Sequence, residues 1–487
     1  MMKQTATNLI RCIGKWALCI FLSGQLSMPA VAQAPTPSSV SMLTVDKAVE
    51  IALAQSPTVM IQDVSFVKQQ YAQRSDWATL YPSVDISGNY GYTLKKQRMY
   101  FDGFPGAEAM PGMEDGIEMG RTHNIQAGIS VGLPLINAQL WEKLALSREQ
   151  VELSWMQAKN SRADLEVEVR KAFYSALLAK ESVAVLSESF ANARQNYKSV
   201  QDKYQQGLVA QYDLLRAEVA MNNLEPNLLQ AQSAANLARK QLFLLMGLEL
   251  DQQDIVLDGD LEDLGRNISV YEMQESELNR NPNLLLLRKQ GSMLQHSINL
   301  SKYSFFPTVN LGGNYMYSFS SNKLDLDNKK LWVPHSVVSL SISIPIFSGG
   351  KRINSVRTAR AEHLIHELRT NDTRKQLSLA AKSQWEQITT SLKKIDANKR
   401  AIETAQQGYT IASKRYDTGM GTQLELDDAR LQLLQAQLSL KQTQHELLIA
   451  NTELNKLRGA YSQDLQPNDL GERLDQIRKN TALFPKK

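Results

Sequence analysis

The sequence WEQITTSLKKIDANKRAIETAQQGYTIASKRY, from Trp385 to Tyr416, decides the fold of this chain. Its apolar side chains recur at intervals of three, four or seven residues, the spacing of a helix that buries one seam against neighbouring helices. These positions are Trp385, Ile388, Leu392, Ile395, Ile402, Ala405, Tyr409, Ala412 and Tyr416. The pattern predicts a long helix that packs lengthwise along others, followed by a turn and a second helix that returns to Gly459.

A second copy of this seam lies in the first half of the chain, from Phe173 to Tyr204, with one charged exception at Lys180. The two copies stay in register through the turn and as far as a terminal glycine, where Gly247 matches Gly459. The sequence therefore predicts two internal repeats, each built on a pair of very long helices.

The first residues have the three-part form of a secretory signal. Basic residues at Lys3, Arg11 and Lys15 precede an apolar run over residues 16–22, and small residues lead to a predicted cleavage site after Ala32. The alternative, a transmembrane anchor, would need a longer apolar run. Both cysteines of the chain lie in this segment, so the exported chain is expected to have neither cysteine nor attached lipid.

The composition describes a folded protein with much polar surface. Of the 487 residues, 43% are hydrophobic, and the mean hydropathy is −0.33, which excludes a bundle of membrane-spanning helices. The 54 basic and 50 acidic residues nearly balance. Since phosphate-driven binding needs a basic excess, no nucleic-acid partner is expected.

Four segments of about ten residues alternate apolar and polar side chains, the pattern of β-strands with two different faces. They span about residues 82–92, 124–134, 307–317 and 337–345. The polar face carries Ser, Gly, Asn and Gln, which suits a watery lumen, and tyrosines such as Tyr90 and Tyr315 lie near strand ends. A soluble sandwich gives a similar signal, but the secretory signal and the polar face favour strands that cross an outer membrane.

The predicted organisation has five parts. They are a signal peptide (1–32), a first repeat (33–247) with a helix, two strands and a long helix pair over about 139–247, an equatorial linker (248–271), a second repeat (272–459) with a long helix pair over about 350–459, and a C-terminal tail (460–487). One helix is expected from Leu43 to Gln73, with Thr44 as its N-cap, and a kink is expected at Pro226. Pro134 is expected to end the second strand, and the Met-rich segment 93–122 is expected to be a loop.

Four strands cannot close a barrel within one chain, because single-chain barrels of this type need about eight or more. An open sheet edge in lipid would leave backbone groups without hydrogen-bond partners. The barrel is therefore expected to be shared between chains. The long helices also require neighbouring chains, because each chain exposes an apolar seam on both of its sides.

Several motifs, and the order in which they follow one another, resemble those of the TolC-like outer-membrane factor family, also called the outer membrane efflux proteins. They are Leu-Thr-Val-Asp-Lys-Ala-Val-Glu-Ile-Ala-Leu from Leu43 to Leu53, the helix start Asn281-Pro282, the strand start Phe306-Pro307, Ile-Pro-Ile-Phe-Ser-Gly-Gly from Ile344 to Gly350, and the turn from Tyr416 to Ala429. Each motif alone is weak, whereas their duplicated order across the mature chain is specific.

The resemblance implies a mixed α and β membrane protein that forms a homotrimer. Each chain would give four strands to a 12-stranded outer-membrane β-barrel and four helices to a 12-helix periplasmic α-barrel. The function implied is a passive export duct, located in the cell outer membrane with a long periplasmic extension. It would contact outer-membrane lipid and work with a periplasmic adaptor protein and an inner-membrane transporter in efflux or type I secretion.

The family likeness also implies functional residues at the periplasmic entrance, where the helix pairs turn. Glu425 and Asp428 occupy positions where relatives place an inward acidic pair, and three copies would give a ring of six carboxylates that favours cations. The alternative is that they only pair with the helix dipole.

In the first turn, the likeness implies an entrance latch in which Asp213 accepts a hydrogen bond from Tyr416 and Arg216 pairs with a neighbouring acid. Gly421 stands where relatives have a basic residue, so this chain departs from the family pattern there. Tyr416 and Tyr204 could instead be ordinary aromatic residues of the seam.

No residue pattern predicts an enzyme, a metal site or a cofactor. His363 and His366 lie three apart beside Glu367, but no third ligand of the required kind is near, and a solvated helix face accounts for them. The alternative to a channel is a non-conducting structural coiled-coil protein of the cell envelope. That alternative explains the helices but not the four two-faced strands.

Overall fold

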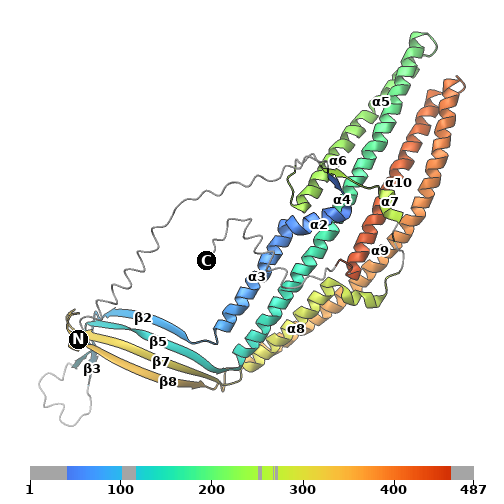
Figure 1. Ribbon diagram of the computed structural model, residues 1–487. Helices are drawn as coiled ribbons and strands as arrows, with labels where there is room; N and C mark the ends of the chain where they lie inside the picture. Colours follow the sequence, from blue (N-terminus) through green and yellow to red (C-terminus); the bar gives the residue numbers. More distant parts are fainter. Residues whose placement is uncertain (1–40, 101–116, 251–254, 267, 269–271, 462–487) are drawn as a thin grey trace, which may run out of the picture. The chain divides into compact units, whose positions relative to one another are not determined.

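The computed structural model describes residues 41–100, 117–250, 255–266, 268 and 272–461 (Figure 1). The predicted signal peptide and nearly all of the C-terminal tail lie outside the described residues. The chain divides into two compact units, and the smaller one contributes only residues 41–42 and 255–256 to the described part. Two short strands, β1 (Ser41–Leu43) and β6 (Ile255–Leu257), pair with each other. The other elements belong to the larger unit.

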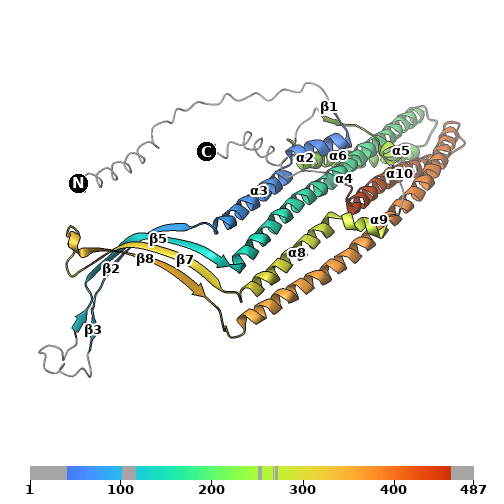
Figure 2. The same cartoon turned by 60° about the horizontal axis from the view of Figure 1, so that its bottom comes forward.

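Four long strands form an antiparallel sheet in the order β2-β5-β7-β8 (Figure 2). They are β2 (Ser83–Tyr92), β5 (His123–Asn137), β7 (Thr308–Ser321) and β8 (Trp332–Ser343). The two outer strands, β2 and β8, therefore each leave one edge without a partner strand among the described residues.

The register gives the sheet two chemically different faces, because residues paired across antiparallel strands point to the same side. One row of paired residues consists of Val84, Val131, Gly313 and Val338. The adjacent row, on the opposite face, consists of Ser83, Gly132, Gly312 and Ser339. Apolar and polar rows continue to alternate along the strands, although Met316, Val333 and Val337 interrupt the polar face.

Strand β5 continues beyond Pro134, which was expected to end it. The pairing with β7 shifts register between Pro134 and Ile136, and the bulge accommodates a residue that has no N–H to donate. The Met-rich segment 93–122 also contains structure that we did not expect. Strands β3 (Gln97–Met99) and β4 (Ile117–Met119) pair as a short hairpin.

The single helix expected from Leu43 to Gln73 is wrong, because the structure has two helices there. Helix α2 (Val45–Gln55) ends at Ser56, whose backbone is extended, and α3 (Pro57–Ala78) begins at Pro57. A proline disfavours helical backbone in the residue before it and suits the first position of a new helix. The expected N-cap is present, since the Thr44 side chain accepts a hydrogen bond from the Lys47 backbone N–H.

Two helices of 68 and 67 residues dominate the chain: α4 (Ala138–Gln205) and α9 (Lys351–Asp417). At 1.5 Å per residue each is about 100 Å long. Near Pro226 the returning helix breaks into α5 (Gln211–Asn222) and α6 (Leu224–Met246). The proline ring would meet the carbonyl group four residues earlier, at Asn222, which is where α5 ends.

The helices pack side by side in a fixed order (Figures 1 and 2). In the half next to the sheet, the order is α3, α4, α8 (Pro282–Tyr303) and α9; in the other half it is α6, α4, α10 (Gln423–Arg458) and α9. Among the described helices, α3 and α6 thus form one border of this arrangement and α9 forms the other. Every helix of the described residues is too short or too polar to cross a membrane.

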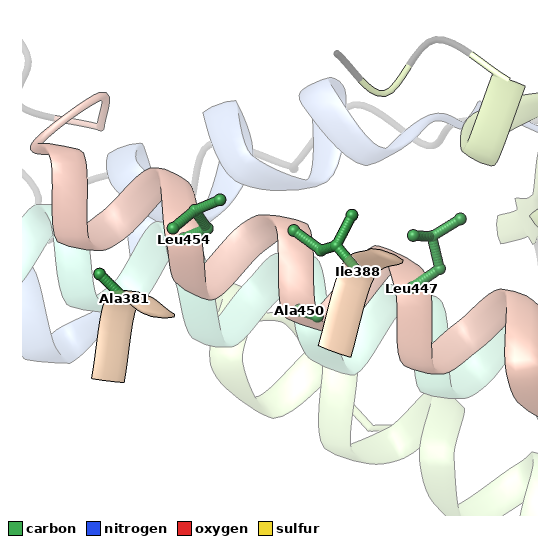
Figure 3. Close-up of a cluster of buried hydrophobic side chains, with 5 residues drawn as sticks. All are labelled: Ala381, Ile388, Leu447, Ala450 and Leu454. Carbon is green, nitrogen blue, oxygen red and sulfur yellow. The ribbon is translucent and has the colours of Figure 1, made fainter. Parts of the chain in front are cut away.

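Core contacts run along the helix seams. Figure 3 shows Ala381 and Ile388 of α9 packed with Leu447, Ala450 and Leu454 of α10. One buried contact between α3 and α4 is an ion pair. The Arg162 guanidinium donates to both carboxylate oxygens of Asp63 at 2.7 Å, and both side chains are only 2% exposed.

Candidate functional site

The candidate site lies where the two long helix pairs turn. In the first turn, α4 ends at Gln205, and Gly207 takes a left-handed backbone with φ of 73°. In the second turn, Gly419 has the same φ, and the Arg415 carbonyl accepts hydrogen bonds from two successive backbone N–H groups. A residue with a side chain would be strained at either glycine, so both turns depend on it.

The predicted acidic pair lies in the first turns of α10. The Thr422 hydroxyl caps the helix by accepting from the Glu425 backbone N–H at 3.3 Å. The Glu425 carboxylate is exposed and 3.6 Å from the Arg415 guanidinium, while exposed Asp428 accepts from Gln432 at 2.8 Å. Being three residues apart, the two carboxylates share a helix face and remain open to solvent.

The structure does not form the Asp213–Tyr416 hydrogen bond within one chain. The Tyr416 hydroxyl oxygen is buried and has no hydrogen-bond partner among the described residues. The Lys203 ammonium lies over its ring, 4.9 Å from the centroid. Burial raises the pKa of Tyr416, and the negative charges of Asp213 and Asp427 raise it further.

Arg216 pairs with an acid that sequence reasoning did not select. Its Nε atom lies 3.7 Å from Oδ2 of Asp427, so the bridge joins α5 to α10. Asp427 also accepts from Arg430 at 2.8 Å and from Gln423 at 3.1 Å. Burial raises the pKa of Asp427, and the charges of Arg430 and Arg216 act against this. The signal in the sequence was the spacing of Gln423, Asp427 and Arg430, four and three residues apart on one helix face.

Gly421 is closely packed. A Cβ atom there would lie 3.0 Å from Cβ of Arg415 and 3.1 Å from the backbone N of Tyr416. The turn would therefore have to shift by a few tenths of an ångström to accept the basic residue that the family likeness implies at this position.

The histidines that could have suggested a metal site have other contacts. His366 Nε2 lies 2.7 Å from the Leu287 carbonyl oxygen, and His363 is 3.6 Å from Glu367. Within the described residues, no group of three or more His, Cys, Asp or Glu side chains could hold a metal ion.

Solved structures share this fold, which is that of TolC-like outer-membrane channels. The outer membrane channel CmeC of Campylobacter jejuni matches with a TM-score of 0.71 at 15% identity, over 95% of this chain and 99% of CmeC. VceC of Vibrio cholerae matches with a TM-score of 0.68 at 16% identity, over 85% of this chain and 96% of VceC.

The family follows from the sequence. The model of the outer membrane efflux protein family matches residues 48–248 and 274–460. Similar proteins include the alkaline protease secretion protein AprF of Pseudomonas aeruginosa, 21% identical over 69% of each chain. The outer membrane protein TolC of Vibrio cholerae is 18% identical over 70% of this chain and 77% of TolC. This chain belongs to the outer membrane efflux protein family.

Proposed function

We propose that this protein is a passive export duct of the outer membrane, formed by three copies of the chain. The observation that carries the proposal is the position of its open edges. The sheet ends at β2 on one side and β8 on the other, and the helices end at α3 and α6 on one side and α9 on the other. Since α3 leads into β2 and β8 leads into α9, sheet and helices are open at the same two borders.

Backbone groups on an open edge in lipid would lack hydrogen-bond partners, so β8 of one copy would pair with β2 of the next. Such head-to-tail contacts close into a ring. Two copies would supply eight strands, and the interior of an eight-stranded barrel is filled by side chains. Three copies supply 12 strands and form the smallest such ring whose interior leaves the polar face of the sheet in contact with water. The family likeness supports the same number of copies.

Exposed apolar side chains on the border helices support this closure. On α3, Ile61, Val64 and Tyr71 are 61%, 44% and 53% exposed, at intervals of three and seven residues. On α9, Ile365 and Leu368 are 47% and 63% exposed. Apolar residues at heptad spacing bury themselves against another helix, which a neighbouring copy would provide.

The two faces of the sheet then acquire different surroundings. The apolar face would contact outer-membrane lipid and the polar face would line the lumen, while the helices continue the duct into the periplasm. The division into a signal peptide (1–32), two repeats (33–247 and 272–459), an equatorial linker (248–271) and a tail (460–487) is part of this proposal.

At the periplasmic entrance, three copies of Glu425 and Asp428 would form the ring of six carboxylates. A ring of fixed negative charge attracts cations and repels anions. Arg415, at 3.6 Å from Glu425, would weaken the field without cancelling it. The ion pair between Arg216 and Asp427 would hold the two turns of one chain together. Tyr416 and Asp213 would be the latch residues where turns meet.

A passive duct depends on partners that supply energy. The similar proteins include secretion proteins for proteases, AprF and PrtF, and the cobalt-zinc-cadmium resistance protein CzcC. We infer that this chain likewise serves an inner-membrane transporter through a periplasmic adaptor, in efflux or type I secretion, and that it catalyses no reaction. The alternative of a non-conducting structural protein leaves the two-faced sheet without a role and is not favoured.

Membrane fractionation and planar-bilayer recording test the proposal. We expect the protein in the outer membrane, as a detergent-resistant oligomer that conducts ions without added nucleotide. A monomer in the soluble periplasmic fraction, or a membrane oligomer without conductance, would contradict it.

A further inference from the structure

The apolar face of the sheet has a hollow near the β7–β8 hairpin. Its volume is about 500 Å³, and it is lined by Ala127, Tyr317, Lys329 and Trp332. The strands continue into α4 and α9 at their opposite ends, so the hollow lies at the end of the sheet away from the long helices. In the proposed duct this end faces the outer leaflet of the membrane.

Small residues form the floor of the hollow and aromatic residues form its walls. Ala127 is paired with Gly88, and a Cβ atom on Gly88 would meet no atom within 4 Å. The Trp332 ring packs on Phe319 with centroids 5.3 Å apart, and its indole N–H donates to the Leu326 carbonyl oxygen at 3.1 Å. These contacts hold Trp332 in place as a wall, so the hollow does not depend on a mobile side chain.

One cation lies at the rim of this apolar hollow. Lys329 is exposed and forms no ion pair among the described residues, although Asp325 and Asp327 belong to the same hairpin. Lys330 is also exposed but does not line the hollow. Apolar walls with a single ammonium group at the edge complement a molecule that has a hydrocarbon part and an anionic head.

We propose that this hollow binds a phosphorylated membrane lipid, with an acyl chain along Ala127 and a phosphate on Lys329. A soluble anion would gain nothing from the apolar walls, whereas an acyl chain gains from each methylene that it buries. The position also suits a lipid, because Trp and Tyr collect at the level of the headgroups. The inference rests on the proposed function, since it needs the apolar face to meet the membrane.

Native mass spectrometry and lipid titration of the detergent-purified protein test this inference. The probes are lipid A carrying its phosphates, the same lipid without phosphate, and inorganic phosphate. Lys329→Gln should weaken binding of phosphorylated lipid A about tenfold, the loss of one charge-assisted contact, and leave the phosphate-free lipid unchanged. Lys330→Gln is the matched control and should change neither. Ala127→Leu fills the hollow and should weaken binding of both lipids.

Equal effects of Lys329→Gln and Lys330→Gln would overturn the inference, and so would displacement of the lipid by inorganic phosphate alone. Each variant is also fractionated and recorded in planar bilayers. If the wild-type protein conducts but the two lysine variants bind lipid A equally, only this inference fails. If the wild-type protein does not enter the outer membrane, the proposed function fails.

Discussion

The bridge between the two turns gives a prediction about local stability. Arg216→Gln removes the charge on α5 that contacts Asp427 on α10, while Asp427 keeps Arg430 as a partner. We therefore expect α5 to open more readily, and α10 to be affected less. Removing Arg216 should have no such effect when Asp427 has already been replaced by Asn, because the interaction is then absent from the start.

The structure sets the size of this effect. The two groups are 3.7 Å apart, with side chains 30% and 15% exposed. At an effective dielectric constant of about 20, two unit charges at this distance attract by about 4.5 kcal/mol, which is an upper bound. Partial exposure and the ordering of a long side chain reduce it, since exposed pairs contribute only about 0–1 kcal/mol. We expect a coupling of about 1 kcal/mol, or roughly fivefold in the opening equilibrium.

Amide hydrogen exchange on α5 measures that equilibrium. Arg216→Gln should accelerate exchange roughly fivefold in the wild-type background, consistent with the coupling above, and leave it unchanged in the Asp427→Asn background. Arg194→Gln removes an exposed arginine of α4 that has no ion pair in the described part of the chain, and it serves as the control. An equal acceleration in both backgrounds would show that Arg216 acts through something other than Asp427.

The pH dependence of this coupling follows from the raised pKa of Asp427. Because the folded pKa lies above the unfolded value near 3.8, the stability contributed by this carboxyl is present below the unfolded pKa and is lost as pH rises through the folded pKa. The coupling energy between Arg216 and Asp427 depends on pH in the opposite direction, because it requires the charged carboxylate and therefore increases as pH rises. The difference between Arg216→Gln and wild type should therefore shrink as pH falls through the folded pKa of Asp427.

Two further substitutions test the entrance and the packing of the helices. Replacing Glu425 and Asp428 together by Ala should weaken cation selectivity, seen as a smaller reversal potential under a salt gradient; an unchanged potential would exclude the acidic ring. Arg162→Met removes the guanidinium that pairs with buried Asp63 and should cost about 3–5 kcal/mol, measured as lost amide protection in α3. Lys143→Gln breaks the more exposed ion pair between Lys143 of α4 and Asp76 of α3 and should cost less than about 1 kcal/mol. A similar loss in both variants would contradict the role of burial.

The seam of apolar residues from Trp385 to Tyr416 was enough to predict the long helices, because their period follows directly from helix geometry. The family was likewise predictable from the order of the motifs. The breaks within the helical segments were harder to predict. Pro57 and Pro226 mark them in the sequence, but whether a helix kinks or separates into two depends on the packing of each part.

The hairpin β3–β4 and the bridge to Asp427 escaped prediction for a different reason. The hairpin is only three residues long on each side, too short for a periodic signal. Asp427 lies beside two carboxylates that the family likeness singled out, and its partner Arg216 is far away in the sequence. Such a pair is visible only when the two turns are placed side by side.

The central claim is that sister copies close the duct edge to edge, and cross-linking of β2 to β8 tests it most directly. Both cysteines of the sequence lie within residues 1–32, the proposed signal peptide. Once that segment is removed as proposed, one cysteine introduced in β2 and one in β8 report on this contact alone. A scan of pairs across the two strands should give covalent species in denaturing gels that increase in size up to three chains and stop there. Cross-links confined to single chains, or a ladder that ends at two chains or continues past three, would contradict the account.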